Sequence, residues 1–118
     1  MKRTNLIDAM LSDLVLRTEE INTVAKTVAS ASKCFTEDDN AETCIDLLTD
    51  VYWEILVDPT LCQFSLPHIA LTCALLCEFD GSHYFKRLWA KRAKAHFNRV
   101  KSFNTHHMEL LSSMLANN

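Results

Sequence analysis

Apolar residues recur every three or four positions along most of this chain, a spacing that predicts amphipathic helices. The first such segment covers about Asn5–Ser32 and is compatible with one long helix or with two. Residues 33–40 are mostly polar, so an acidic loop is expected there, with side chains able to cap the next helix. That second main helix is expected over Ala41–Val57, with an inward face formed by Ile45, Leu48, Val51 or Tyr52, and Ile55.

The segment Leu66–Phe79 is apolar nearly all round, with Thr72 and Glu78 as the polar residues of its body. A helix without a polar face belongs in the centre of a fold. Gly81 follows it, and glycine readily takes the left-handed conformation that helix ends require. The sequence therefore predicts a buried third helix that ends near Asp80.

A short fourth helix is expected through Tyr84–Trp89, followed by a fifth that includes Phe97 and Met114. Glycine and proline are absent between these two, so the pattern leaves their boundary open. One glycine and two prolines are too few for the turns of a β-sandwich or β-barrel. The prediction is an all-α fold: a compact five-helix bundle with a central third helix, forming a single domain over residues 1–118, where 1–32 is the N-terminal helical segment.

Composition supports a folded domain of ordinary type. The chain has 118 residues, of which 48% are hydrophobic and 23% charged, enough to bury a core without metal or disulfides. No run of apolar residues is long enough for a membrane span, and Asp8 and Asp13 interrupt what would be the apolar region of a signal peptide. An odd count of five cysteines favours reduced thiols. An intracellular protein is expected, without membrane contact.

Two groups of residues raise the question of a metal site. Cys73 and Cys77 lie four positions apart, on one face of a helix, with His68 nearby. A structural zinc site needs four converging ligands, and buried cysteine is common, so core packing is the favoured interpretation. His106–His107 lacks partners at metal-binding spacing. Neither a metal nor a cofactor is expected. A phosphate-binding loop is not expected either, because it needs several glycines and the chain has one. A noncatalytic protein is therefore predicted.

Charge is distributed unevenly along the chain. Acidic side chains dominate residues 1–60 and basic ones dominate 61–118, although the net charge is only −3. The candidate basic surface comprises Lys86, Arg87, Lys91, Arg92, Lys94, Arg99 and Lys101. Such a segment can bind phosphate backbones.

The aromatic residues interleaved with this basic segment argue against nucleic-acid binding. They are Tyr84, Phe85, Trp89, Phe97 and Phe103, and their spacing predicts that they pack inward, where they cannot stack on bases. A solvated or protein-facing basic surface is favoured, and nucleic-acid binding by the helix 86–101 remains an alternative.

Two helices are expected to meet at a tight corner between Ile55 and Cys77. The first ends at Asp58-Pro59 and the second begins at Ser65-Leu66-Pro67. Ser65 is expected to accept a hydrogen bond from a free backbone N–H of the second helix, and Pro67 lies in its first turn, where a missing N–H costs nothing.

This corner resembles the second cyclin box of transcription-type cyclins such as cyclin C and cyclin H. The similarity lies in Val57-Asp58-Pro59-Thr60-Leu61-Cys62 followed by Pro67-His68-Ile69-Ala70-Leu71-Thr72-Cys73, with Asp58, Pro59, Ser65, Pro67, Ile69, Ala70 and Leu71 as the structural motif. The main region of resemblance lies within residues 41–118. Counted generously, the similarity covers about Glu42–Leu111, and its specific part is confined to Val57–Cys77. A cyclin box has five helices with the third buried at its centre.

The resemblance implies a noncatalytic nuclear subunit that regulates a cyclin-dependent kinase in transcription or the cell cycle. The kinase-contacting residues of such cyclins belong mainly to the first box, so none can be transferred to this chain. A protein partner is expected instead on the acidic helix, at Asp46, Asp50 and Glu54, because the absent neighbouring box would cover some of the surface. The alternatives are the nucleic-acid-binding role and an unrelated helical protein-interaction bundle.

Overall fold

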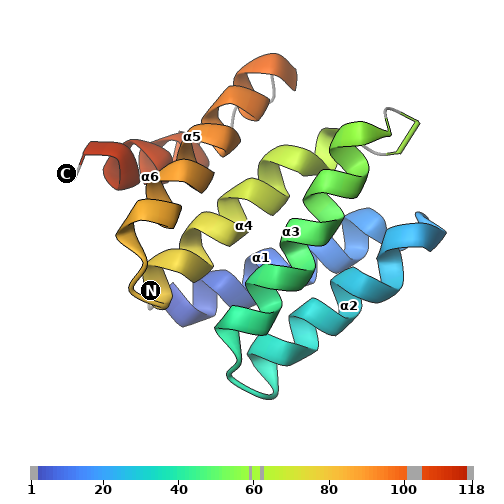
Figure 1. Cartoon of the computed structure of the whole chain (residues 1–118). Coiled ribbons are helices and arrows are strands. Elements are labelled where there is room, and N and C mark those ends of the chain that lie inside the picture. The colour runs from blue at the N-terminus through green and yellow to red at the C-terminus, as the bar shows by residue number, and fades with distance from the viewer. Residues whose placement is uncertain (1–2, 59, 62, 101–104, 117–118) are drawn as a thin grey trace.

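Six α-helices account for most of the residues described by the computed structural model, which are 3–58, 60–61, 63–100 and 105–116. The helices are α1 (Arg3–Thr18), α2 (Asn22–Thr36), α3 (Ala41–Val57), α4 (Leu66–Phe79), α5 (His83–Val100) and α6 (Thr105–Ala116), with a 3₁₀ turn η1 (Gln63–Ser65) before α4 (Figure 1). Within these residues there is no strand. The all-helical class is confirmed, whereas the count of five helices and the cyclin-like arrangement are not.

The additional helix arises in the N-terminal segment, which is two helices rather than one. At the end of α1 the hydroxyl of Thr18 donates to the carbonyl of Leu14 over 2.8 Å, and the amide of Ile21 then donates to the carbonyl of Thr18 over 2.9 Å. The carbonyl of Ile21 in turn accepts a hydrogen bond from the amide of Ala25, and this bond forms part of the first turn of α2. These hydrogen bonds turn the chain without a glycine or a proline.

The acidic loop is shorter than predicted. Helix α2 continues to Thr36 and buries Phe35, so the residues 33–36 belong to a helix and the loop comprises 37–40. Asn40 caps α3 as expected, because its side-chain oxygen accepts a hydrogen bond of 3.0 Å from the amide of Thr43. Asp39 takes the left-handed conformation (φ 52°), which lets the loop turn within so few residues.

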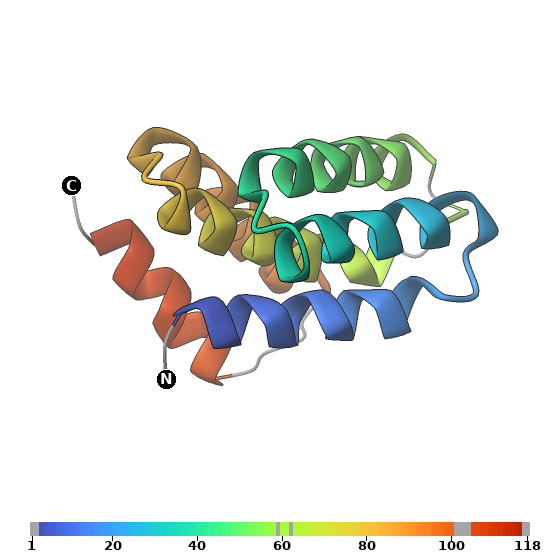
Figure 2. The same cartoon turned by 90° about the horizontal axis from the view of Figure 1, so that it is seen from below.

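Helix α4 lies at the centre of the bundle. It packs against α1, α3 and α5, and every residue from Leu66 to Cys77 is buried. Helices α1, α2 and α3 follow one another side by side, and α6 packs on α5 (Figure 2). Gly81 ends α4 with φ 81°, as predicted. The central position expected for Leu66–Phe79 is therefore confirmed, although this helix is the fourth in the chain.

The predicted division between a fourth and a fifth helix is wrong, because residues 83–100 form one uninterrupted helix. Its inward side chains include Trp89 and Phe97, as expected. Tyr84 and Phe85 were expected to pack inward as well, but 73% and 52% of their surfaces are exposed. In the sequence, both residues come before Lys86, the first of the buried side chains of α5, which packs against α4. Phe103 lies outside the described residues.

The corner between α3 and α4 keeps most of its predicted features. The carboxylate of Asp58 accepts hydrogen bonds from the amide (3.0 Å) and the hydroxyl (2.6 Å) of Thr60, and these lower the pKa of Asp58. Pro67 lies in the first turn of α4. The motif residues Ile69, Ala70 and Leu71 are fully buried core. Pro59 and Cys62 lie outside the described residues.

The capping role predicted for Ser65 is wrong. Ser65 precedes α4 and is buried, but its side chain makes no capping hydrogen bond. Its backbone angles (φ −82°, ψ −18°) are helical because η1 runs directly into α4. A capping side chain reaches the free N–H groups from an extended backbone, which Ser65 does not have.

We expect the substitution Leu75→Ala to lower the free energy of unfolding by about 2–5 kcal/mol, because Leu75 is fully buried in α4 and its removal leaves a cavity. Urea unfolding followed by circular dichroism measures this change. Leu16→Ala is the matched control at an exposed position of α1 and should change stability by less than about 0.5 kcal/mol. Equal losses at the two positions would contradict the central position of α4.

Candidate functional site

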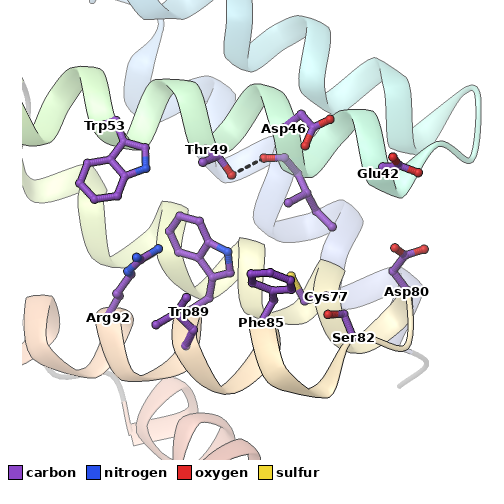
Figure 3. A pocket seen from close by; sticks show the side chains of 12 residues that line it. Glu42, Asp46, Thr49, Trp53, Cys77, Asp80, Ser82, Phe85, Trp89 and Arg92 are labelled. Carbon is purple, nitrogen blue, oxygen red and sulfur yellow. Dashed lines mark hydrogen bonds between the residues drawn. The ribbon is translucent and has the colours of Figure 1, made fainter.

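A groove of about 490 Å³ lies between α3 and α5. Its volume is in the range of about 300–1,000 Å³ that is typical of binding pockets. The residues that line it are Glu42, Ile45, Asp46, Thr49, Trp53, Cys77, Asp80, Ser82, Phe85, Leu88, Trp89 and Arg92 (Figure 3). Helices α3 and α5 run in the same direction, with α4 between them (Figure 1). The groove is therefore a natural candidate for a binding site.

A buried polar contact fastens α3 to α5 beside the groove. The hydroxyl of Tyr52 and Nε2 of His96 are 2.6 Å apart in a hydrogen bond, and the ring of Trp89 meets Tyr52 edge to face at 5.0 Å. Burial lowers the pKa of His96, assisted by the nearby charges of Arg99 and Arg92. Burial also raises the pKa of Tyr52. Both partners are consequently neutral near pH 7.

Arg92 forms one end of the groove by packing on aromatic rings. Its guanidinium carbon lies 4.7 Å from the ring centroid of Trp89, 5.4 Å from that of Trp53 and 5.8 Å from that of Tyr52. These are cation–π distances. Trp53 itself is 45% exposed, an unusual degree for tryptophan, and it shares this end with Arg92 (Figure 3).

Carboxylates gather at the other end of the groove. Glu42 and Asp46 come from the first half of α3, and Asp80 follows α4 (Figure 3). Between the two ends lies the ring of Phe85. The groove therefore joins an acidic end to a cationic aromatic end across an apolar middle.

The acidic residues predicted to bind a partner are only partly brought to this groove. Asp46, Asp50 and Glu54 are all exposed on α3, but Asp46 alone among them lines the groove. Each step of four residues turns the side chain by roughly 40° around the helix, so Asp50 and Glu54 face progressively away. Sequence reasoning missed Trp53 and placed Phe85 in the core.

The predicted basic surface is dispersed over different surroundings. Lys86 is buried, with Nζ 3.9 Å from the carboxylate of Glu78, so its assignment to a surface is wrong. Arg87 donates a hydrogen bond of 2.9 Å to the carbonyl of Leu115 on α6, and Arg92 belongs to the aromatic cluster. The exposed members are Lys91, Lys94 and Arg99, and Lys101 lies outside the described residues.

The cysteines of the core are protonated thiols. Burial raises the pKa of Cys77 to about 11 and that of Cys44 to about 12, and it also raises the pKa of Cys73 well above its ordinary value. Cys73 and Cys77 are buried in α4, which agrees with the packing role predicted for them. Among the described residues no three His, Cys, Asp or Glu side chains converge as metal ligands would. In the same residues no helix is both long and apolar enough for a membrane span.

His68 of α4 links three helices through ring contacts. Its imidazole meets Phe97 of α5 at 5.3 Å and His107 of α6 at 5.8 Å, both edge to face. Burial lowers the pKa of His68 to about 4, with smaller contributions from Arg17 and His107 that outweigh the opposing charge of Asp13. His68 is therefore neutral at pH 7.

Comparison of the chain with protein-family models, with curated proteins and with solved structures finds no match. The resemblance to a cyclin box accordingly rests on the corner motif alone.

We expect Tyr52→Phe to lower the free energy of unfolding by about 1–3 kcal/mol, because the substitution leaves the buried Nε2 of His96 without its partner. Urea unfolding measures the loss. Tyr84→Phe removes the same hydroxyl from an exposed side chain of α5 and should be neutral within about 0.5 kcal/mol. Equal effects would show that the Tyr52–His96 hydrogen bond contributes nothing.

We also expect the protein to lose stability as the pH falls from about 6.5 to about 4. The folded-state pKa of His68 lies below the ordinary value of 6.5, so the unfolded chain takes up a proton first. The contribution of His68 is complete above pH 6.5 and amounts to on the order of 3 kcal/mol. Urea unfolding at a series of pH values measures the slope, which His68→Gln should reduce. Identical slopes for both proteins would show that His68 does not remain neutral.

Proposed function

We propose that this protein is a noncatalytic, cyclin-like interaction module that binds a partner protein in the groove between α3 and α5. The observation that carries the proposal is the exposure of large aromatic side chains inside a groove that also holds carboxylates. Trp53 and Phe85 line it with 45% and 52% of their surfaces exposed. Tryptophan and other aromatic residues are the usual anchors of protein interfaces.

The chemistry of the groove supports binding over catalysis. Cys77 is the thiol among the lining residues, and with a pKa of about 11 it is protonated near neutral pH. Thr49 uses its hydroxyl to donate a hydrogen bond of 2.7 Å to the carbonyl of Ile45, one turn earlier in α3. The thiol of Cys77 and the hydroxyl of Thr49 are thus both held in structural surroundings.

The cyclin-like part of the proposal rests on the corner between α3 and α4. It is supported by Asp58, which accepts a hydrogen bond from Thr60 at this corner, by Pro67 in the first turn of α4, and by the burial of α4 at the centre of the bundle. A cyclin-dependent kinase is accordingly the partner we propose. Exposed Asp50 and Glu54 would extend the binding surface beyond the groove along α3.

Nucleic-acid binding is the weaker alternative. A phosphate backbone needs a continuous row of accessible cations. The basic segment does not provide one, because Lys86 is buried and Arg92 stacks on tryptophan. The carboxylates of the groove would repel phosphate.

We expect Phe85→Ala to weaken binding of a purified cyclin-dependent kinase by about tenfold or more, because it removes a groove anchor. Tyr84→Ala removes the neighbouring exposed ring, which does not line the groove, and should leave binding unchanged. Biolayer interferometry with the immobilised chain and a panel of purified kinases measures both affinities, and circular dichroism confirms that the variants fold.

Two results would contradict this assignment. Equal binding by the Phe85 and Tyr84 variants would place the contact outside the groove. Failure to bind any kinase, together with salt-sensitive binding of DNA or RNA, would favour the nucleic-acid alternative. Binding of neither would leave an unrelated interaction bundle as the better description of the chain.

A further inference from the structure

We infer that the groove binds an extended peptide segment with a basic side chain at one end, apolar side chains in the middle and an acidic side chain at the other end. The inference rests on the proposed function and specifies its partner. It follows from the separation of charge along the groove, where Glu42, Asp46 and Asp80 lie at one end and Arg92 at the other (Figure 3).

The acidic end remains negative when the helix dipoles are included. Helices α3 and α5 both begin at this end, and each N-terminus contributes about half a positive charge. Helix α4 ends there at Phe79 and contributes about half a negative charge. Together the three helix ends contribute about half a positive charge. The three carboxylates outweigh this charge, so this end attracts a lysine or arginine side chain.

The cationic end has an unused capacity for a carboxylate. The guanidinium carbon of Arg92 lies over the rings of Trp89 and Trp53 at cation–π distances. A guanidinium group held in this way keeps N–H groups that can donate to a carboxylate in a bidentate manner. Among the described residues, Arg92 forms neither an ion pair nor a hydrogen bond. An acidic side chain of a partner would supply that missing acceptor.

The length of the groove sets the spacing of the two charges. Trp53 follows Asp46 by seven positions and Glu42 by eleven in α3, which corresponds to about 10 Å and about 16 Å along the helix. An extended peptide advances about 3.3 Å per residue. The basic and acidic side chains should thus be about three to five residues apart, with apolar side chains between them to meet Phe85 and Leu88.

Three synthetic peptides of about six residues test the inference. They share a leucine-rich middle and blocked termini, and they carry arginine and glutamate at opposite ends, arginine at both ends, or glutamate at both ends. Both tryptophans of the chain line the groove, so intrinsic fluorescence reports its occupation. We expect the mixed-charge peptide to bind about threefold to tenfold more tightly than either of the others.

Variants of the groove should change this ranking in a defined way. Asp46→Lys should favour the peptide with two glutamates, and Arg92→Gln should make the mixed peptide no better than the one with two arginines. Glu20→Lys changes the net charge of the chain as much as Asp46→Lys does, but at an exposed position in the turn between α1 and α2, outside the groove, and should leave the ranking unchanged.

The outcomes separate this inference from the proposed function. If the peptide with two arginines binds best, or if no peptide binds, the inference fails. The proposed function is judged independently by the loss of kinase binding in Phe85→Ala. If Glu20→Lys reorders the peptides as Asp46→Lys does, overall charge determines binding and the inference is again overturned.

Discussion

The burial of α4 on three sides is the constraint on which the remaining structure depends. Its residues from Leu66 to Cys77 are buried, so α1, α3 and α5 must each present an apolar face to it. Packed helices keep their axes about 8–10 Å apart. With α4 between them, α3 and α5 meet through long side chains. The groove is the space that this spacing leaves above Cys77.

The side chains that bridge α3 and α5 serve both the core and the site. Tyr52 is buried and bonds His96, its ring contacts Trp89, and Trp89 in turn supports Arg92. The position of the guanidinium in the groove is consequently set by the core, which would preorganise it for the partner proposed above.

Much of the fold was predictable because its strongest signals are local. An apolar helix with no polar face belongs inside wherever it occurs, and Gly81 and Asn40 act through their own backbone and immediate neighbours. The turn between α1 and α2 gave no such signal. It is made by Thr18 and Ile21 through backbone and hydroxyl hydrogen bonds that many sequences can form.

The wrong prediction for Phe85 has a different origin, because the sequence pattern did not show which face of α5 is buried. The buried residues of α5 are Lys86, Trp89, Ala90, Ala93, His96 and Phe97. Their spacing follows one helical stripe, and this stripe includes a lysine and excludes the neighbouring phenylalanine. Hydrophobicity favoured Phe85 as the inward residue, whereas the register of Trp89 and Phe97 favours Lys86. Glu78 accommodates the buried charge at 3.9 Å, a tertiary contact that the sequence pattern could not reveal.

The polarity of the groove follows from helix direction more than from any single residue. Acidic side chains are favoured near helix N-termini because they offset the positive end of the dipole. Glu42 occupies the first turn of α3, and Asp80 lies shortly before α5. Since α3 and α5 run in the same direction over α4, these two preferences coincide at one end of the groove (Figure 1). An antiparallel pair would have placed them at opposite ends and left the groove without a charge gradient.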